Sequence, residues 1–324
     1  MPHPAARYLA RRLIALLLVW LGISLLAYGL SALAPGDPAE LILLRQTGEM
    51  PSAEAVERLR RELGLDDPWA VRYARWVGHA ALGDLGTSYR TGEPVARALA
   101  ERFPATLQLA VAALLIGLAI ALPLGVLSAV RRGSALDHAS RLAALVGASL
   151  PSFWLGYLLI LVFAVRLGVL PVAGHGRLAH LVLPALTLGL ASAASLMRLT
   201  RASVLEVLGA DYVRTARAKG VPERLVLARH TLRSALNPMV TFTGVRFGRL
   251  LAGAVVVETV FAWPGIGKHV VDAILDRDYP TIQGYVLFMG AVFVVINLVV
   301  DLSYHWLDPR VGPAGAAGNA GGGR

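Results

Sequence analysis

Long apolar runs alternate with short charged segments along most of this chain. Five runs of about 20 residues or more contain no Asp, Glu, Lys or Arg, and a sixth is interrupted by Arg246 and Arg249. About 20 apolar residues in a helix cross the hydrocarbon core of a bilayer. The pattern therefore predicts an all-α, polytopic membrane protein with six transmembrane helices. The predicted spans are 13–35, 103–130, 142–165, 178–197, about 238–257 and 279–300.

The charges between the runs predict the orientation. Arginines are concentrated before the first run, between 131 and 141, and above all in 201–236. Segment 36–102 instead carries slightly more acids than bases. An excess of Lys and Arg marks the cytoplasmic side, so we expect both termini in the cytoplasm. The formal net charge of +10 then follows membrane topology, and we expect no nucleic-acid partner.

The first apolar run has two interpretations. Ala32-Leu33-Ala34 resembles the cleavage site of a signal peptide. However, the run is longer than the apolar region of a usual signal, and Pro35 follows at once. We therefore favour a retained span.

The polar segments predict further parts of the chain. Residues 1–12 are expected to be a cytoplasmic terminus, and 36–102 is too long for a simple connection, so we expect a small external cap there. A helix is predicted from a Ser52 cap to Gly64, and another opens at Pro94. Spans two to six form a permease domain over 103–308, and the Gly- and Ala-rich tail 309–324 is predicted to be disordered.

The basic loop at 201–236 shows helix signals. The fourth span is predicted to continue toward Leu208, Asp211 is a candidate N-cap, and Gly220 is a candidate C-terminal stop. Pro222 fits the first turn of a second helix, which ends before Asn237-Pro238. A short helix between two spans can be pushed as a rigid lever. It can equally be a helical hairpin that covers the end of the bundle.

These residues resemble a known family, the permeases of bacterial binding-protein-dependent ABC importers for oligopeptides, dipeptides and nickel. The segment from Asp211 to Gly220 is similar to their cytoplasmic motif, Glu-Ala-Ala, three residues, then Gly. Arg214-Thr215-Ala216 occupies the triplet, without its glutamate. The resemblance covers about 7–311. Further motifs that carry it are Ala34-Pro35-Gly36-Asp37-Pro38, Glu62-Leu63-Gly64-Leu65-Asp66, Gly83-Asp84-Leu85-Gly86-Thr87-Ser88, Phe261-Ala262-Trp263-Pro264-Gly265-Ile266-Gly267, Arg277-Asp278-Tyr279-Pro280-Thr281-Ile282-Gln283 and Leu307-Asp308-Pro309-Arg310.

The resemblance implies a subunit of a larger importer in the bacterial inner membrane. Its partners would be membrane lipid, a second permease subunit, two ATPase subunits that carry ATP and Mg, and an external solute-binding protein. A cytoplasmic helix would dock on the ATPase and pass ATP-driven closure to the spans. The residues assigned to this coupling are Asp211, Tyr212, Arg214, Thr215, Ala216, Lys219 and Gly220. The resemblance favours di- or oligopeptides as substrate, with a nickel chelate as the alternative.

The sequence contains no convincing catalytic site. A phosphate-binding loop needs G-x-x-x-x-G-K-[S/T], and the nearest approach has Ala262 for the first glycine and His269 for the hydroxyl residue. No cofactor is therefore expected on this chain. An intramembrane protease is the enzyme alternative, but Gly147-Ala148-Ser149 is followed by Pro151 and has no paired histidine. With no cysteine and scattered histidines, no metal site is expected.

Charges inside the fifth span predict a pathway. A charge in hydrocarbon costs at least about 2.5–3.5 kcal/mol, so Arg246 and Arg249 should face water or protein. We expect them to line the pathway, with structural pairing as the alternative. Gly244 and Gly248 form a small-residue pair suited to close helix packing. An ion-coupled carrier or channel is the other class considered, but it needs acids deep in the spans, and Asp301 lies near an end.

Overall fold

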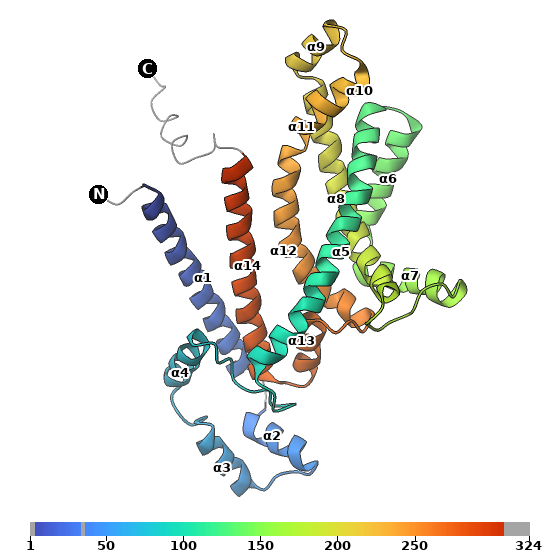
Figure 1. The fold of residues 1–324 in the computed structure, drawn as a ribbon. Helices are drawn as coiled ribbons and strands as arrows, with labels where there is room; N and C mark the ends of the chain where they lie inside the picture. The colour runs from blue at the N-terminus through green and yellow to red at the C-terminus, as the bar shows by residue number, and fades with distance from the viewer. Residues whose placement is uncertain (1–3, 34–35, 308–324) are drawn as a thin grey trace. The chain divides into compact units, whose positions relative to one another are not determined.

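The computed structural model describes residues 4–33 and 36–307 (Figure 1). The described residues are helical or irregular, and the single β contact among them is an isolated bridge between Thr87 and Pro94. The all-α prediction is confirmed. The chain divides into two compact units, one formed by residues up to Pro104 with His269–Val294, the other by Ala105–Lys268 with the residues from Val295 onward.

The first unit contains the first helices of the chain and parts of two helices near its C-terminal end. They are α1 (Pro4–Leu33), α2 (Pro38–Thr47), α3 (Ala53–Glu62), α4 (Trp69–Ala81), the first turns of α5 (Val95–Val130), most of α13 (Ile266–Leu275) and the first half of α14 (Tyr279–Leu307). The predicted helix after Ser52 is confirmed, since the Ser52 hydroxyl accepts a hydrogen bond from the Ala55 N–H at 3.3 Å. The predicted helix that opens at Pro94 is also confirmed, as α5 starts at Val95.

Side chains of α4 pack against α1. The Ser24 and Tyr73 hydroxyls lie 2.8 Å apart, and the rings of Tyr28 of α1 and Tyr73 of α4 lie 5.6 Å apart between centroids. Farther along the same unit, the buried Asp278 carboxylate accepts hydrogen bonds from the Ser88 hydroxyl at 2.5 Å and the Thr281 hydroxyl at 2.8 Å. These contacts attach the turn before α5 to the start of α14.

The second unit is arranged around α8. Its elements are the rest of α5, α6 (Ala135–Ser149), α7 (Ser152–Leu159), the π-helical turn η1 (Ile160–Arg166), α8 (Leu178–Leu208), α9 (Asp211–Ala218), α10 (Glu223–Leu225), the π-helical turn η2 (Val226–Thr231), α11 (Leu232–Ala235) and α12 (Asn237–Val260). Helix α8 packs against α6, α7 and α12. It also approaches α5 closely, because a Cβ at Gly189 would lie 2.8 Å from the Ala113 carbonyl oxygen. The predicted end of the fourth span at Leu208 is confirmed.

Three helices of the described chain are long and apolar enough to cross a membrane, and a bent pair makes a possible fourth. The three are Val95–Val130, Leu178–Leu208 and Tyr279–Val300. Segment Leu18–Ser31 of α1 is a shorter apolar helix, and α12 carries Arg246 and Arg249. The count of six spans stays a prediction.

The third predicted span is not one straight helix. Helix α6 and the α7–η1 segment are bent by 107° at Leu150-Pro151. Leu150 is extended, with φ −77° and ψ 129°. Proline has no N–H to continue the helical ladder and disfavours a helical residue before it, which explains the break. The predicted disordered tail, 309–324, lies outside the described residues.

Candidate functional site

Helix α9 is the short helix of the basic loop that follows α8 (Figure 1). It begins at Asp211, and the residue in the N-cap position is Ala210, which has extended backbone and makes no side-chain cap. The prediction that Asp211 is the N-cap is therefore wrong by one residue. Asp211 lies in the first turn instead, where a carboxylate favours the positive end of the helix and its Oδ1 is 3.6 Å from Arg214 Nη1.

One face of α9 is apolar and packed. Val213 is fully buried and Ala216 nearly so, and both cluster with the fully buried Val226 of η2. Val207 of α8 and Val221 complete the cluster. Because the apolar face meets both flanking elements, α9 is held to the body of the second unit rather than hanging from it as a tether.

The opposite face of α9 is polar and exposed. Six of the seven residues assigned to coupling are exposed to solvent, and the seventh, Ala216, is buried. The exposed ones are Asp211, Tyr212, Arg214, Thr215, Lys219 and Gly220. Two of these exposed residues, Tyr212 and Arg214, are of types that are enriched at protein interfaces.

The turn after α9 depends on Gly220. Its φ of +77° is in the left-handed region, which favours glycine, and its N–H donates to the Arg217 carbonyl at 2.9 Å. Across the turn, the Arg217 guanidinium donates two hydrogen bonds to the Glu223 carboxylate, at 3.1 and 2.6 Å. These hydrogen bonds favour the charged carboxylate, so the pKa of Glu223 is below its ordinary value.

Elements η2 and α11 connect this turn to α12. The Thr231 hydroxyl donates to the Val226 carbonyl at 3.2 Å, inside the wide π-helical turn. In α11, Ala235 is buried against Ala129 of α5 and Val204 of α8. The loop therefore returns to the ends of two long helices, so a displacement of α9 has a packed route to them.

A buried carboxylate lies next to this region. Asp137, in the first turn of α6, accepts hydrogen bonds from Ser128 Oγ at 2.6 Å, the Gly133 N–H at 3.0 Å, and Arg201 Nε and Nη2 at 2.8 and 2.9 Å. The pair joins the α5–α6 corner to α8. Sequence analysis missed it, because it counted Arg201 among the bases of the loop and gave Asp137 no role; no local signal marks residues 64 positions apart as partners.

A second buried carboxylate lies at the far end of α12. Glu258 is fully buried and accepts hydrogen bonds from the Thr106 hydroxyl at 2.6 Å and the Lys268 backbone N–H at 2.9 Å. A Cβ at Gly265 would lie 2.2 Å from Glu258 Oε1, and one at Gly267 would lie 2.8 Å from Oε2. The two glycines are therefore required because their backbone passes directly against the carboxylate.

The turn between Glu258 and these glycines is held by contacts of Trp263 with other residues of the second unit. Trp263 is buried, and its indole N–H donates to the Ala105 carbonyl at 2.9 Å. The ring of His175 meets it edge-on at 4.6 Å between centroids. Ala262 adopts a φ of +48°, which is unusual for a residue with a Cβ. This is the segment in which sequence analysis looked for a phosphate-binding loop.

The predicted pathway residues lie along α12. Arg249 is exposed, whereas Arg246 is partly buried and its guanidinium lies 5.1 Å from the centre of the Phe242 ring. The Arg246 Nε is buried and has no hydrogen-bond partner among the described residues. On another side of α12, a Cβ at Gly244 would lie 2.4 Å from Val300 Cγ2, and Gly248 is buried. Gly244 therefore permits close packing of α12 on the end of α14 within this chain.

Comparison with known families agrees with this arrangement. Residues 121–313 match the family model of the binding-protein-dependent transport system inner membrane component, and residues 5–110 match the N-terminal model of the same kind of membrane component. The chain belongs to this family of ABC importer permeases and is a multi-pass membrane protein.

Named relatives cover almost the whole chain. The probable D,D-dipeptide transport system permease DdpB of Escherichia coli is 42% identical over 95% of this chain and 98% of its own length. The dipeptide transport system permease DppB of the same organism is 39% identical over 94% and 98%. A putative peptide transport system permease of Brucella abortus is 44% identical over 90% and 95%.

A solved structure has a similar fold. A chain of the MetNI methionine ABC transporter, in inward-facing crystal forms, matches with TM-scores of 0.54 and 0.56 at 21% identity. The match covers 65% of this chain and 96% of that chain. The match shows a common fold between that chain and this one.

Proposed function

We propose that this chain is one of two permease subunits of an ATP-driven importer of di- or oligopeptides. Its relatives at 39–44% identity carry the names of dipeptide and peptide permeases, which favours peptides over a nickel chelate. A second permease subunit, two ATPase subunits and an external solute-binding protein complete the machine. ATP and Mg act on the ATPase subunits, and both termini of this chain are cytoplasmic.

The observation that carries the coupling role is the division of α9 into two faces. The buried Val213 and Ala216 attach the helix to α8 and η2, and the exposed Tyr212 and Arg214 remain available to a neighbour. A helix that is rigidly attached and polar outside can transmit a push. We propose that the ATPase receives this face and that α8, α11 and α12 carry the movement to the spans.

The test of coupling uses the assembled complex in proteoliposomes. We expect Tyr212→Ala combined with Arg214→Ala to lower ATP-dependent peptide uptake about tenfold, the equivalent of about 1.4 kcal/mol of interface energy. Arg58→Ala is the matched control, since Arg58 is an exposed arginine of α3 in the other unit. Uptake by the double variant equal to that of the control variant contradicts the assignment.

Substrate class needs its own measurement. Uptake of a labelled dipeptide that requires both ATPase subunits and the external binding protein supports the proposal. Uptake of a nickel chelate in its place supports the nickel alternative. Uptake by this chain alone, driven by an ion gradient, identifies a secondary carrier and overturns the ABC mechanism.

Within this function, we propose that Arg246 and Arg249 line the pathway. Arg246 and Arg249 lie three residues apart on α12, so two positive charges gather there and attract an anionic group such as a peptide carboxylate. We expect Arg246→Gln to reduce uptake of a free dipeptide about tenfold and uptake of its C-terminal amide much less. Equal losses for both peptides indicate a structural role for Arg246.

A further inference from the structure

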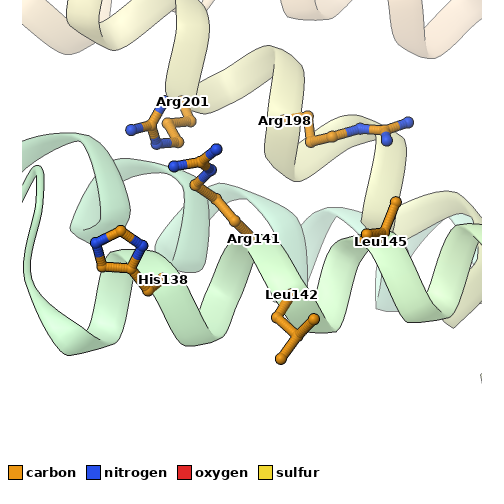
Figure 2. Close-up of a pocket in the computed structure, with 6 residues that line it drawn as sticks. All are labelled: His138, Arg141, Leu142, Leu145, Arg198 and Arg201. Carbon is orange, nitrogen blue, oxygen red and sulfur yellow. The ribbon is translucent and has the colours of Figure 1, made fainter.

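A basic cavity of about 510 Å³ lies between α6 and α8, away from the coupling face of α9. Figure 2 shows the six residues that line it, four from α6 and two from α8. They are His138, Arg141, Leu142, Leu145, Arg198 and Arg201. Neither the coupling role nor the pathway residues of α12 make use of it.

The cavity has an excess of positive charge. Arg201 is balanced by the buried carboxylate of Asp137, which takes two of its N–H groups. Arg141 and Arg198 are both exposed, and within the part of the chain that the structure describes neither forms an ion pair. Two guanidinium groups therefore remain for an anion, and His138 lines the same cavity.

The exposed side chains of α6 change from charged to apolar along the helix. Arg141 lies six residues into the helix, about 9 Å from its start at a rise of 1.5 Å per residue. The next exposed large side chains are apolar: Leu142 is 62% exposed, Leu145 57% and Val146 49%. A bound group that is anionic at one end and hydrocarbon at the other matches this sequence of side chains.

We propose that the cavity binds the phosphate headgroup of an anionic phospholipid, with an acyl chain along Leu142, Leu145 and Val146. Guanidinium groups match phosphate oxygens with paired hydrogen bonds, and basic pockets between transmembrane helices on the cytoplasmic side are suited to anionic headgroups. The end of α6 that carries Arg141 follows the basic turn at Arg131 and Arg132, which the proposed orientation places at the cytoplasmic surface.

A lipid fits these observations better than an acidic segment of the second permease subunit. A pairing acid would satisfy Arg141 and Arg198 but would leave the apolar surface below them without a partner. An arginine left in hydrocarbon without a partner is costly, and a lipid phosphate would remove that cost while its acyl chain covers the leucines. The second subunit is nevertheless the occupant that the experiment must be able to detect.

The first experiment measures lipid retention by native mass spectrometry of the intact complex, purified in a mixture of phosphatidylglycerol and phosphatidylcholine. We expect the native complex to retain phosphatidylglycerol, and Arg141→Gln with Arg198→Gln to reduce the retained fraction about tenfold. Arg131→Gln with Arg132→Gln is the matched control, because it removes the same charge from an exposed turn outside the cavity. Equal retention in the two double variants overturns the proposal.

Two further arms separate other occupants. Excess inorganic phosphate should leave phosphatidylglycerol bound; complete displacement indicates a site for free phosphate and overturns the lipid assignment. Because this chain has no cysteine, Leu142→Cys gives it one position for a maleimide photo-crosslinker, in a complex whose other subunits have had any cysteines replaced. Crosslinks to phosphatidylglycerol support the proposal, and crosslinks to the second permease subunit overturn it. Neither readout depends on which solute is transported.

Discussion

The two ends of the second unit each contain a buried carboxylate, but the two carboxylates have different partners. Asp137, where α5 turns into α6, is paired with the Arg201 guanidinium of α8 and so forms a neutral ion pair. Glu258, at the far end of α12, accepts its hydrogen bonds from the Thr106 hydroxyl and the Lys268 backbone N–H.

The difference concerns what each carboxylate holds together. Asp137 joins side chains of two long helices, so its contribution is lost when either side chain is changed. Glu258 holds a stretch of main chain, the turn that leads into α13, and the absence of side chains at Gly265 and Gly267 is part of its site. The first arrangement is sensitive to charge, and the second is sensitive to volume.

Removing the Asp137 carboxylate should lower the free energy of unfolding more than any other change considered below. We expect Asp137→Ala to lower the free energy of unfolding by about 3 kcal/mol, because it leaves the Arg201 guanidinium partly buried without its carboxylate. Thermal and denaturant unfolding of the purified chain in detergent measures it. Adding Arg201→Met should restore most of the loss; a single variant as stable as the native chain contradicts the ion-pair account.

Adding a methyl group at Gly265, next to Glu258, should lower the free energy of unfolding somewhat less. We expect Gly265→Ala to destabilise the chain by about 2 kcal/mol, since its Cβ would overlap the Glu258 carboxylate. Gly253→Ala in α12 is the control, where the new Cβ would meet Leu188 at an ordinary 3.9 Å. The same unfolding measurement should show the control unchanged or slightly more stable. Similar losses in both variants would mean that volume is not the constraint at Gly265.

Replacing the Glu258 carboxylate by an uncharged amide should lower the free energy of unfolding by a still smaller amount. We expect Glu258→Gln to lower the free energy of unfolding by about 1 kcal/mol, because the amide keeps the shape but presents its NH₂ to a group that is itself a donor, Thr106 or the Lys268 N–H. If Glu258→Gln destabilises as much as Asp137→Ala, the contrast between the two ends is wrong.

The smallest effect should come from the exposed Arg217–Glu223 pair at the turn after α9. The pKa of Glu223 is lowered in the folded chain, so the unfolded chain takes up the proton first as the pH falls. The stabilisation from Arg217 is therefore complete above about pH 4.5 and is lost as the pH falls through the folded pKa. The melting temperature should decline slightly more in the native chain than in Glu223→Gln over this range; parallel curves would show that the pair contributes nothing.

Features set by neighbouring residues were predictable from the sequence. The helix after Ser52, the helix from Val95 and the end of α8 at Leu208 all followed from local caps, prolines and periodicity. The Asp211 cap was wrong by one residue because the helix starts there with Ala210 before it. The break at Pro151 carried a local signal, yet the apolar run through it was read as one span.

The buried charges were not predictable, because their partners are distant in sequence. Thr106 and Glu258 are 152 residues apart, and Ser128, Asp137 and Arg201 come from three helical segments. Sequence analysis assigned no role to Glu258. The turn glycines after Phe261 attracted attention as a possible nucleotide loop, whereas the structure shows that they make room for a carboxylate of the same chain.

The packing around Glu258 has a consequence for protein engineering. At position 265 the carboxylate of Glu258 occupies the space that a side chain would fill, so positions 258 and 265 can vary only together, whereas at Gly267 the nearest atom is the backbone Cα of Val255. A mutant library that randomises position 265 alone should return glycine, whereas a library that randomises 258 and 265 together gives a smaller acid at 258 a route to accommodate alanine at 265, with glycine kept at 267.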